Sequence, residues 1–224
     1  RLFLAATLAA CGAALAAPVA RAADPAPAPA PAATAADPAP AAAPAVAAAT
    51  TTASPRFAAL PAEKGPYLVG EVGRADVEQA FPAWRDTAAA YVPDPAEVAR
   101  LAAVDRPVAI TCVLGTWCGD SRREVPRFWR LLDLAANPNL ELRMFAVGRK
   151  DDAAAAAKLA ELGLPADLRG QYQVTAVPTF IFTADGHELG RIIETPIATL
   201  ESDAAGILAA LGEAGGAEGG GAWR

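Results

Sequence analysis

The chain has 224 residues and a formal net charge of −6. Since no stretch of it clusters Lys and Arg, this acidic balance excludes the electrostatic footprint of a nucleic-acid-binding protein. Alanine contributes 61 residues, about half of the 54% that are hydrophobic, so the bulk apolar fraction overstates the size of the core.

Charge is distributed unevenly along the chain. Residues 1–53 hold only four of the 44 charged residues, and the rest of the chain holds 17 basic and 23 acidic ones. That density is ordinary for one globular domain, so we predict a single domain behind a low-complexity leader. After the leader, no stretch approaches 18 consecutive apolar residues, and no membrane-spanning helix is expected there.

The first segment, 1–22, is predicted to be an export signal, because an apolar run rich in Leu and Ala occupies 2–17. Two processing signals compete inside it. Residues 20–22 (ARA) offer small side chains at the −3 and −1 positions of a signal-peptidase site, whereas 8–12 (LAACG) resembles a bacterial lipobox in which Cys11 is lipidated. Both interpretations stay open. Both predict an exported protein, either periplasmic or a membrane-anchored lipoprotein facing the periplasm.

The next segment, 23–54, is almost wholly Ala, Pro and Thr. Proline fixes φ and removes backbone donors, so we predict an extended, disordered linker without chemistry of its own. A spacer of this kind suits a membrane tether, which slightly favours lipidation of Cys11.

Residues 55–94 are predicted to form an N-terminal helical extension. Its beginning, 55–75, is interrupted by Pro and Gly and is interpreted as a lead-in segment. Apolar residues then recur at helical spacing over 77–91, with a start or bend at Pro82. Asp94 and a first-turn proline then begin a second helix, which continues to about 104.

The domain proper is predicted over 95–212, and a Gly-rich tail, 213–224, is expected to be disordered. The nearly continuous apolar run 107–114 (PVAITCVL) predicts a strand buried on both faces of a sheet. The further expected elements are a helix to about 136, a strand at 140–147, a helix at 151–162, a strand at 179–183, a hairpin into 189–194 and a closing helix at 197–211. This order predicts an α/β fold, a mixed central sheet flanked by helices on both faces.

Residues 95–212 resemble the thioredoxin-like superfamily. Trp117-Cys118 follows a buried strand and opens a helix, Pro126 lies where thioredoxins have a helix-kinking proline, and Val177-Pro178-Thr179 is similar to the family's cis-proline motif. The string 117–121 (WCGDS) looks like that of a group of bacterial exported thioredoxin-family proteins. The resemblance implies a thioredoxin-like fold with thiol redox chemistry.

Cys118 is the predicted reactive residue. A cysteine in the first turn of a helix meets the positive end of the helix dipole and free backbone N–H groups, and both stabilise a thiolate. By resemblance to thioredoxins, Trp117 shields the thiol and Pro178, in the cis form, faces it. The same resemblance gives Val177 a role in binding an extended peptide through its backbone.

Two positions depart from a dithiol oxidoreductase. Ser121 stands where the second cysteine would resolve a mixed disulfide, and Cys112 stands where thioredoxins carry a buried acid. Strand residues advance by about 3.3 Å each, so Cys112 is predicted to lie far from Cys118 and to be a core residue. Asp120 is expected either to stabilise the helix terminus or to assist proton transfer, and helix stabilisation is favoured.

No metal site and no cofactor are predicted, because His187 is the only histidine and falls at the expected hairpin turn. The leading functional prediction is thiol–disulfide exchange at Cys118 with a client protein or small-molecule thiol, completed by an external thiol. The alternative is a noncatalytic thioredoxin-fold peptide-binding module. A peroxidatic cysteine is disfavoured, since Thr116 lies two residues before Cys118 and not in the spacing that such a site requires.

Overall fold

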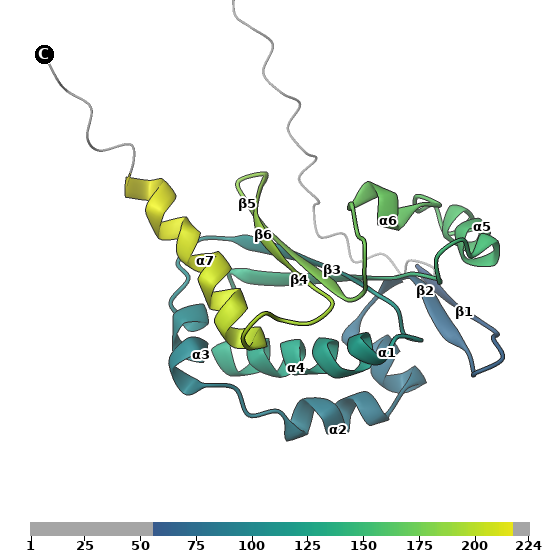
Figure 1. Cartoon of the computed structure of the whole chain (residues 1–224), viewed down its shortest axis with the longest axis horizontal. Coiled ribbons are helices and arrows are strands. Elements are labelled where there is room, and N and C mark those ends of the chain that lie inside the picture. The colour runs from purple at the N-terminus through teal and green to yellow at the C-terminus, as the bar shows by residue number, and fades with distance from the viewer. Residues whose placement is uncertain (1–55, 217–224) are drawn as a thin grey trace, which may run out of the picture. The chain divides into compact units, whose positions relative to one another are not determined.

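The computed structural model describes residues 56–216, which form a six-stranded mixed sheet with helices on both faces (Figure 1). The strands are β1 (Phe57–Leu60), β2 (Tyr67–Val72), β3 (Val108–Leu114), β4 (Leu140–Ala146), β5 (Thr179–Ala184) and β6 (His187–Ile193). The helices are α1 (Arg74–Ala80), α2 (Ala83–Ala90), α3 (Pro95–Ala102), α4 (Gly119–Ala135), α5 (Ala153–Glu161), α6 (Leu168–Gln171) and α7 (Leu200–Gly216). The predicted α/β class with a mixed sheet is confirmed. The predicted export signal and linker, and the end of the predicted tail, lie outside the described residues.

The strand predicted to be buried on both faces, β3, lies inside the sheet. The strand order is β1-β2-β4-β3-β5-β6, with β3 parallel to β4 and antiparallel to β5. Strands β5 and β6 form the predicted hairpin. Its turn residues, Asp185 and Gly186, have φ of 51° and 79°, the left-handed backbone that a two-residue hairpin turn requires.

The region before the domain differs from the helical extension predicted over 55–94. Its first part, expected to be only a lead-in segment, forms the antiparallel pair β1 and β2, and β2 joins the sheet beside β4. The Pro and Gly residues that interrupt this part concealed two short strands. Gly70 has φ of +114°, and a Cβ there would lie 2.2 Å from the carbonyl oxygen of Arg56, so the strand pair needs glycine at this position.

Of the start or bend predicted at Pro82, the structure shows a start: Pro82 is the N-cap of α2, which is separate from α1. Asp94 caps α3 as predicted, with its carboxylate accepting the Ala96 N–H at 2.8 Å. Two further differences concern helices. The short α6 had no signal in the sequence, and α7 continues to Gly216 instead of ending near Leu211. Among the described residues, no helix has the length and apolar character needed to cross a membrane.

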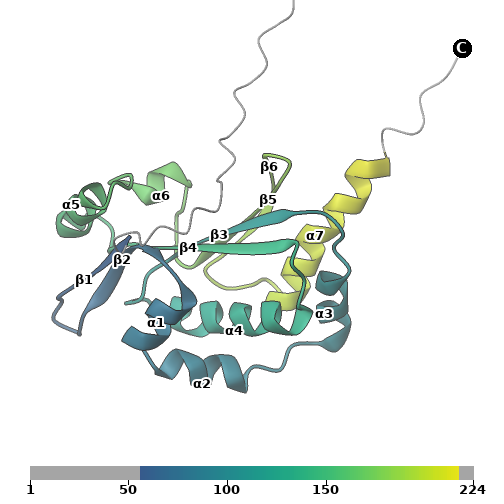
Figure 2. The same cartoon turned by 180° about the vertical axis from the view of Figure 1, so that it is seen from behind.

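Helices α3, α4 and α7 lie on one face of the sheet, with α2 packed on the outer side of α4, and α5 and α6 lie on the other face (Figures 1 and 2). We call these the α4 face and the α5 face. Side chains of β3 alternate between them, as the twofold repeat of a strand requires. Ile110, Cys112 and Leu114 belong to the cluster on the α4 face, and Val113 belongs to the cluster on the α5 face.

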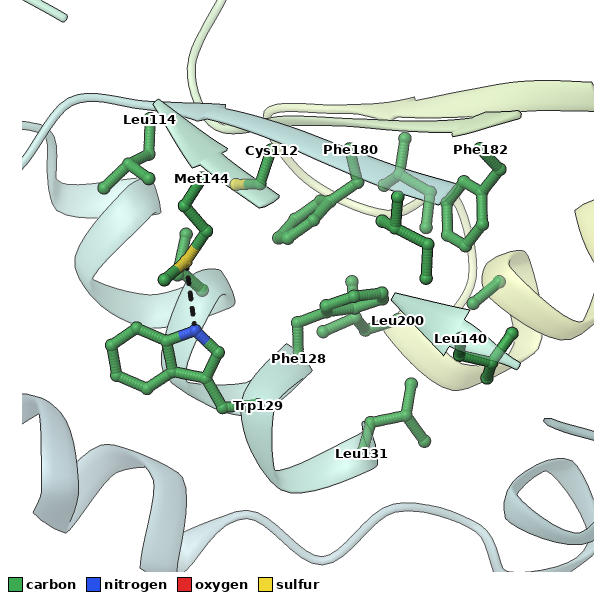
Figure 3. Close-up of a cluster of buried hydrophobic side chains, with 14 of the residues drawn as sticks. Cys112, Leu114, Phe128, Trp129, Leu131, Leu140, Met144, Phe180, Phe182 and Leu200 are labelled. Carbon is green, nitrogen blue, oxygen red and sulfur yellow. Dashed lines mark hydrogen bonds between the residues drawn. The ribbon is translucent and has the colours of Figure 1, made fainter. Parts of the chain in front are cut away.

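The core on the α4 face is rich in aromatic residues (Figure 3). The Phe128 ring lies 4.5 Å from that of Phe180 and 6.1 Å, edge on, from that of Phe182, measured between centroids. The indole N–H of Trp129 donates to the sulfur of Met144 at 3.3 Å. All of these side chains are almost completely buried, so α4 is held against the sheet and the position of its N-terminus is fixed.

Candidate functional site

Cys118 is the N-cap residue of the 17-residue helix α4, directly after the turn that follows β3. The residue is partly exposed. The Sγ atom lies 3.2 Å from the carbonyl oxygen of Val177, which accepts the thiol hydrogen. The Val177–Pro178 peptide bond is cis, as the resemblance to thioredoxins implied. The structure therefore brings Cys118, Val177 and Pro178 together, although about 60 residues separate them along the chain.

Trp117 packs beside the thiol. Its indole N–H donates to the carbonyl oxygen of Val147 at 2.9 Å. The guanidinium carbon of Arg149 lies 4.5 Å from the centroid of the Trp117 ring, in a cation–π contact. Trp117 and Cys118 both pack against the hydrophobic cluster of the α5 face. The indole thus joins the cysteine turn to the segment that follows β4.

Ser121 is fully buried. Its Oγ accepts the Gly115 N–H at 3.2 Å and thereby ties the first turn of α4 to the end of β3. Gly115 itself admits no side chain, because a Cβ there would lie 2.7 Å from the Trp117 ring. The position of a resolving thiol is therefore occupied by a hydroxyl that stabilises the cysteine turn.

Asp120 lies in the first turn of α4, where a negative charge interacts favourably with the helix dipole. Its Oδ1 accepts from Nη2 of Arg123 at 2.8 Å, and its Oδ2 is 3.9 Å from the Cys118 sulfur. Arg123 also pairs with the buried carboxylate of Glu124 at 2.5 Å. The shorter contacts of Asp120 are thus to the helix, and its contact with the thiol is long.

Thr116 is a site residue whose role the sequence did not indicate. It is fully buried, and its Oγ1 accepts the Leu68 N–H of β2 at 2.9 Å. Its carbonyl oxygen accepts from Nε of Arg122 at 3.0 Å. These bonds hold the cysteine turn against β2, a strand that had not been predicted, so no local signal revealed the role.

Arg169, at α6, is a second such residue. Its Nη2 donates to the carbonyl oxygen of Gly148 at 3.2 Å. Burial lowers the pKa of this guanidinium, and the nearby Cys118 and Asp167 act in the opposite direction. Because α6 itself was not predicted, the position of Arg169 beside the site could not be inferred from the sequence.

Cys112 is fully buried in the aromatic core of the α4 face (Figure 3), as predicted for a core cysteine. Burial raises the pKa of its thiol far above the ordinary value. The cluster against which Cys118 packs lies on the other face of the sheet. Both cysteines are free thiols, and their surroundings give them opposite accessibility.

Within residues 56–216, no group of three or more His, Cys, Asp or Glu side chains is arranged to hold a metal ion. His187 is the exposed first residue of β6, at the hairpin turn. Cys11, the predicted lipidation site, lies outside the described residues.

No protein-family model matches the chain. No curated protein matches it either. Among solved structures, it is similar to a protein of unknown function from Pseudomonas aeruginosa, with 22% identity over 63% of this chain and 87% of that one and a TM-score of 0.43. It is also similar to mitochondrial thioredoxin 3 of Saccharomyces cerevisiae, with 21% identity over 53% of this chain and 97% of that one and a TM-score of 0.31. A third similar structure is a thioredoxin of Fasciola hepatica, with 28% identity over 39% of this chain and 67% of that one and a TM-score of 0.26.

Proposed function

We propose that this protein carries out thiol–disulfide exchange through the single thiol of Cys118. The observation that carries the proposal is the position of Cys118, a partly exposed residue at the N-cap of the long helix α4 and beside the backbone of Val177. Cysteines at helix N-termini are the ones that react as thiolates, because unpaired N–H groups and the helix dipole stabilise negative charge there.

The exchange proceeds in two balanced steps. In the first, the Cys118 thiolate attacks one sulfur of a disulfide, a mixed disulfide with Cys118 forms, and the other half leaves as a thiolate that takes a proton from water. In the second, an external thiol gives up its proton and attacks the mixed disulfide, which releases Cys118 as a thiolate and leaves a new disulfide. One disulfide replaces another, so the cycle needs no net oxidant or reductant.

Release depends on an external thiol because neither nearby position supplies an internal one. Ser121 stands three residues after Cys118, and its hydroxyl cannot form a disulfide. Cys112 is fully buried in the core of the α4 face. The mixed disulfide should therefore persist until a second thiol reaches it, with Val177 and Pro178 bordering the bound group.

The proposal places this chemistry outside the cytoplasm, where disulfides persist. Its support is the apolar run of residues 2–17, which is typical of an export signal, and the string at 117–121, which resembles exported thioredoxin-family proteins. Mass spectrometry of the N-terminus of the mature protein, expressed in a bacterium, tests this. A lipidated Cys11 or a cut after residue 22 supports export, and an unprocessed chain recovered from the cytoplasm contradicts it.

The exchange itself is tested by incubating the full-length chain with glutathione disulfide and mapping adducts by peptide mass spectrometry under nonreducing conditions. Within the domain, we expect one adduct, at Cys118 and not at Cys112, and its full release on addition of a reduced thiol. The Cys118→Ser variant should show no adduct in the domain. A folded protein that forms no adduct at Cys118 would contradict the proposal and favour the noncatalytic peptide-binding module.

A further inference from the structure

A cavity of about 900 Å³ lies beside the cysteine turn, between the segment that follows β4 and helix α6. Its wall includes Val147, Leu168 and Val174, which belong to the hydrophobic cluster against which Cys118 and Trp117 pack. The Trp117 indole also donates to the Val147 carbonyl oxygen. Trp117 and Cys118 do not line the cavity, but the Trp117 indole contacts two residues of its wall, Val147 and Arg149. A third wall residue, Arg169, lies close enough to Cys118 for the two groups to interact electrostatically. The cavity therefore adjoins the cysteine turn through Trp117.

Three basic side chains line this cavity: Arg149, Lys150 and Arg169. Within the described part of the chain, none of them takes part in a salt bridge. The Nε of Arg169 is buried and has no hydrogen-bond partner among those residues. A buried guanidinium N–H without an acceptor is costly, so this group is set up to receive an anionic oxygen.

Two of the acidic side chains in the cavity wall are already engaged. Asp152 caps α5 by accepting the Ala155 N–H at 3.0 Å, and it also accepts the Tyr67 hydroxyl at 2.6 Å. Asp167 caps α6 by accepting the Gly170 N–H at 2.8 Å. The third acidic side chain of the wall, Asp151, is exposed and makes no hydrogen bond within residues 56–216. The groups left for a ligand are thus the donors of the three basic side chains and this one carboxylate.

We infer that the cavity selects the substrate of Cys118: a low-molecular-weight thiol or disulfide that carries carboxylates. The carboxylates pair with Arg169 and Arg149 while the sulfur meets Cys118. This inference rests on the proposed exchange function and names its substrate class. The volume falls in the range of small-molecule sites, which favours a small ligand over an extended acidic protein segment.

The reaction of such a ligand follows the exchange already described. The Cys118 thiolate attacks one sulfur of the anionic disulfide, the S–S bond breaks, and the departing half takes a proton from water. The carboxylates held by the arginines do not react. They hold the sulfur near Cys118 and thereby raise the rate of adduct formation.

The test compares three symmetrical disulfides that differ in charge: anionic 3,3′-dithiodipropionate, neutral bis(2-hydroxyethyl) disulfide and cationic cystamine. The rate of adduct formation at Cys118 is followed by mass spectrometry on the full-length chain. We expect the anionic probe to react about tenfold faster than the neutral one, the size of effect of one charge-assisted hydrogen bond. Cystamine should react most slowly, and 1 M salt should reduce the differences.

The decisive variant is Arg169→Gln, which should bring the rate of the anionic probe to within about twofold of the neutral one, since the charge-assisted bond is lost. The control is Arg106→Gln, which removes the same charge just before the start of β3, whereas the cysteine turn follows the end of this strand. It should leave the faster reaction of the anionic probe unchanged. As a noncovalent check, 3,3′-dithiodipropionate should raise the melting temperature of Cys118→Ser but not that of Cys118→Ser/Arg169→Gln.

The outcomes separate the two proposals. If all three probes react at Cys118 with equal rates, or if Arg169→Gln leaves the anionic preference unchanged, the cavity does not select carboxylates and this inference is overturned, while the exchange function stands. If no probe reacts at Cys118, the proposed function fails. If an acidic peptide disulfide reacts more than tenfold faster than 3,3′-dithiodipropionate, the substrate class inferred here is wrong.

Discussion

The two described cysteines lie six residues apart, and their settings differ in almost every respect. Cys112 is part of β3 and is fully buried among aromatic side chains on the α4 face. Cys118 caps α4, is partly exposed, and packs against the cluster of the α5 face. A cysteine is thus a small core residue at position 112 and a candidate nucleophile at position 118.

The two faces of the sheet differ in the same sense. The α4 face carries the closely packed aromatic core around Phe128 and anchors the helix that presents Cys118. The α5 face holds the cavity and its three basic side chains, none of which forms a salt bridge within residues 56–216. One face thus contains most of the buried aromatic core, and the other contains the cavity and the cluster against which the partly exposed Cys118 packs.

The largest effect is expected from Phe128→Ala on the α4 face. Removing this buried ring should lower the free energy of unfolding by about 3–5 kcal/mol, because the surrounding core cannot fill the cavity that is left. Urea unfolding followed by tryptophan fluorescence measures it. Cys118→Ser, at a residue that packs against the cluster of the α5 face, is the matched variant and should change the free energy of unfolding by less than about 0.5 kcal/mol. Equal losses of unfolding free energy in the two variants would contradict the assignment of the stabilising core to the α4 face.

A smaller loss is expected from Tyr91→Phe. The Tyr91 hydroxyl donates to the buried carboxylate of Glu201, which also accepts the Asp94 N–H at 3.2 Å. Removing a donor from a buried carboxylate should cost about 2–3 kcal/mol. Tyr67→Phe removes a similar bond to Asp152, which is less buried, and should cost less. A larger loss in Tyr67→Phe would contradict the account.

The same carboxylate predicts a pH dependence. Burial alone would raise the pKa of Glu201, but hydrogen bonds from Tyr91 and from backbone N–H groups lower it below its ordinary value. The unfolded chain therefore takes up the proton first, so the stabilisation is complete above about pH 4.3 and is lost as the pH falls through the folded value. Tyr91→Phe should flatten this loss in urea unfolding measured between about pH 3 and pH 7. If the free energy of unfolding of Tyr91→Phe falls with acid as steeply as that of the unmodified chain, Tyr91 does not lower the pKa of Glu201.

Next in size is Ser121→Ala, at the boundary between the two faces. It leaves the buried Gly115 N–H without its acceptor, and we expect a loss of about 1–2 kcal/mol in the free energy of unfolding. Ser202→Ala in α7 is the matched control, because within residues 56–216 its hydroxyl makes no hydrogen bond. If the two variants are equally stable, Ser121 does not hold the cysteine turn.

The smallest effect is a gain. Gly206 lies exposed inside α7, and a Cβ added there meets no atom within 4 Å. Gly206→Ala should therefore raise the free energy of unfolding by about 0.5–1 kcal/mol through helix propensity and reduced chain entropy. Thermal unfolding measures the gain, and the rate of adduct formation at Cys118 is the control, which should not change. A loss of stability would contradict the open surroundings of this position.

The sequence predicted the elements whose signals are local. The apolar run of β3, the Asp185-Gly186 turn and the helix after Trp117-Cys118 were all found, and Cys118 could be placed at a helix start from its neighbours alone. Strands β1 and β2 were missed because both are short and Pro and Gly lie between and beside them, and the pairing of β2 with β4 is a long-range contact that no periodicity reveals.

The surroundings of the thiol were less predictable. Thr116 acts through β2, and Arg169 acts through α6, and both elements were absent from the prediction. Ser121 was recognised as the missing second thiol, but its bond to the Gly115 N–H depends on the geometry of the turn. Contacts that join distant segments are set by tertiary packing, which one sequence does not display.

The most direct test of the account compares the alkylation rates of Cys112 and Cys118 in the same folded, full-length chain, by iodoacetamide labelling and peptide mass spectrometry. Cys118 should be labelled readily, and Cys112 only at the much slower rate set by transient opening of the core. In urea, both should react at similar rates. Labelling of Cys112 in the folded chain at a rate similar to that of Cys118, or no labelling of either cysteine, would contradict the assignment of the reactive thiol to Cys118.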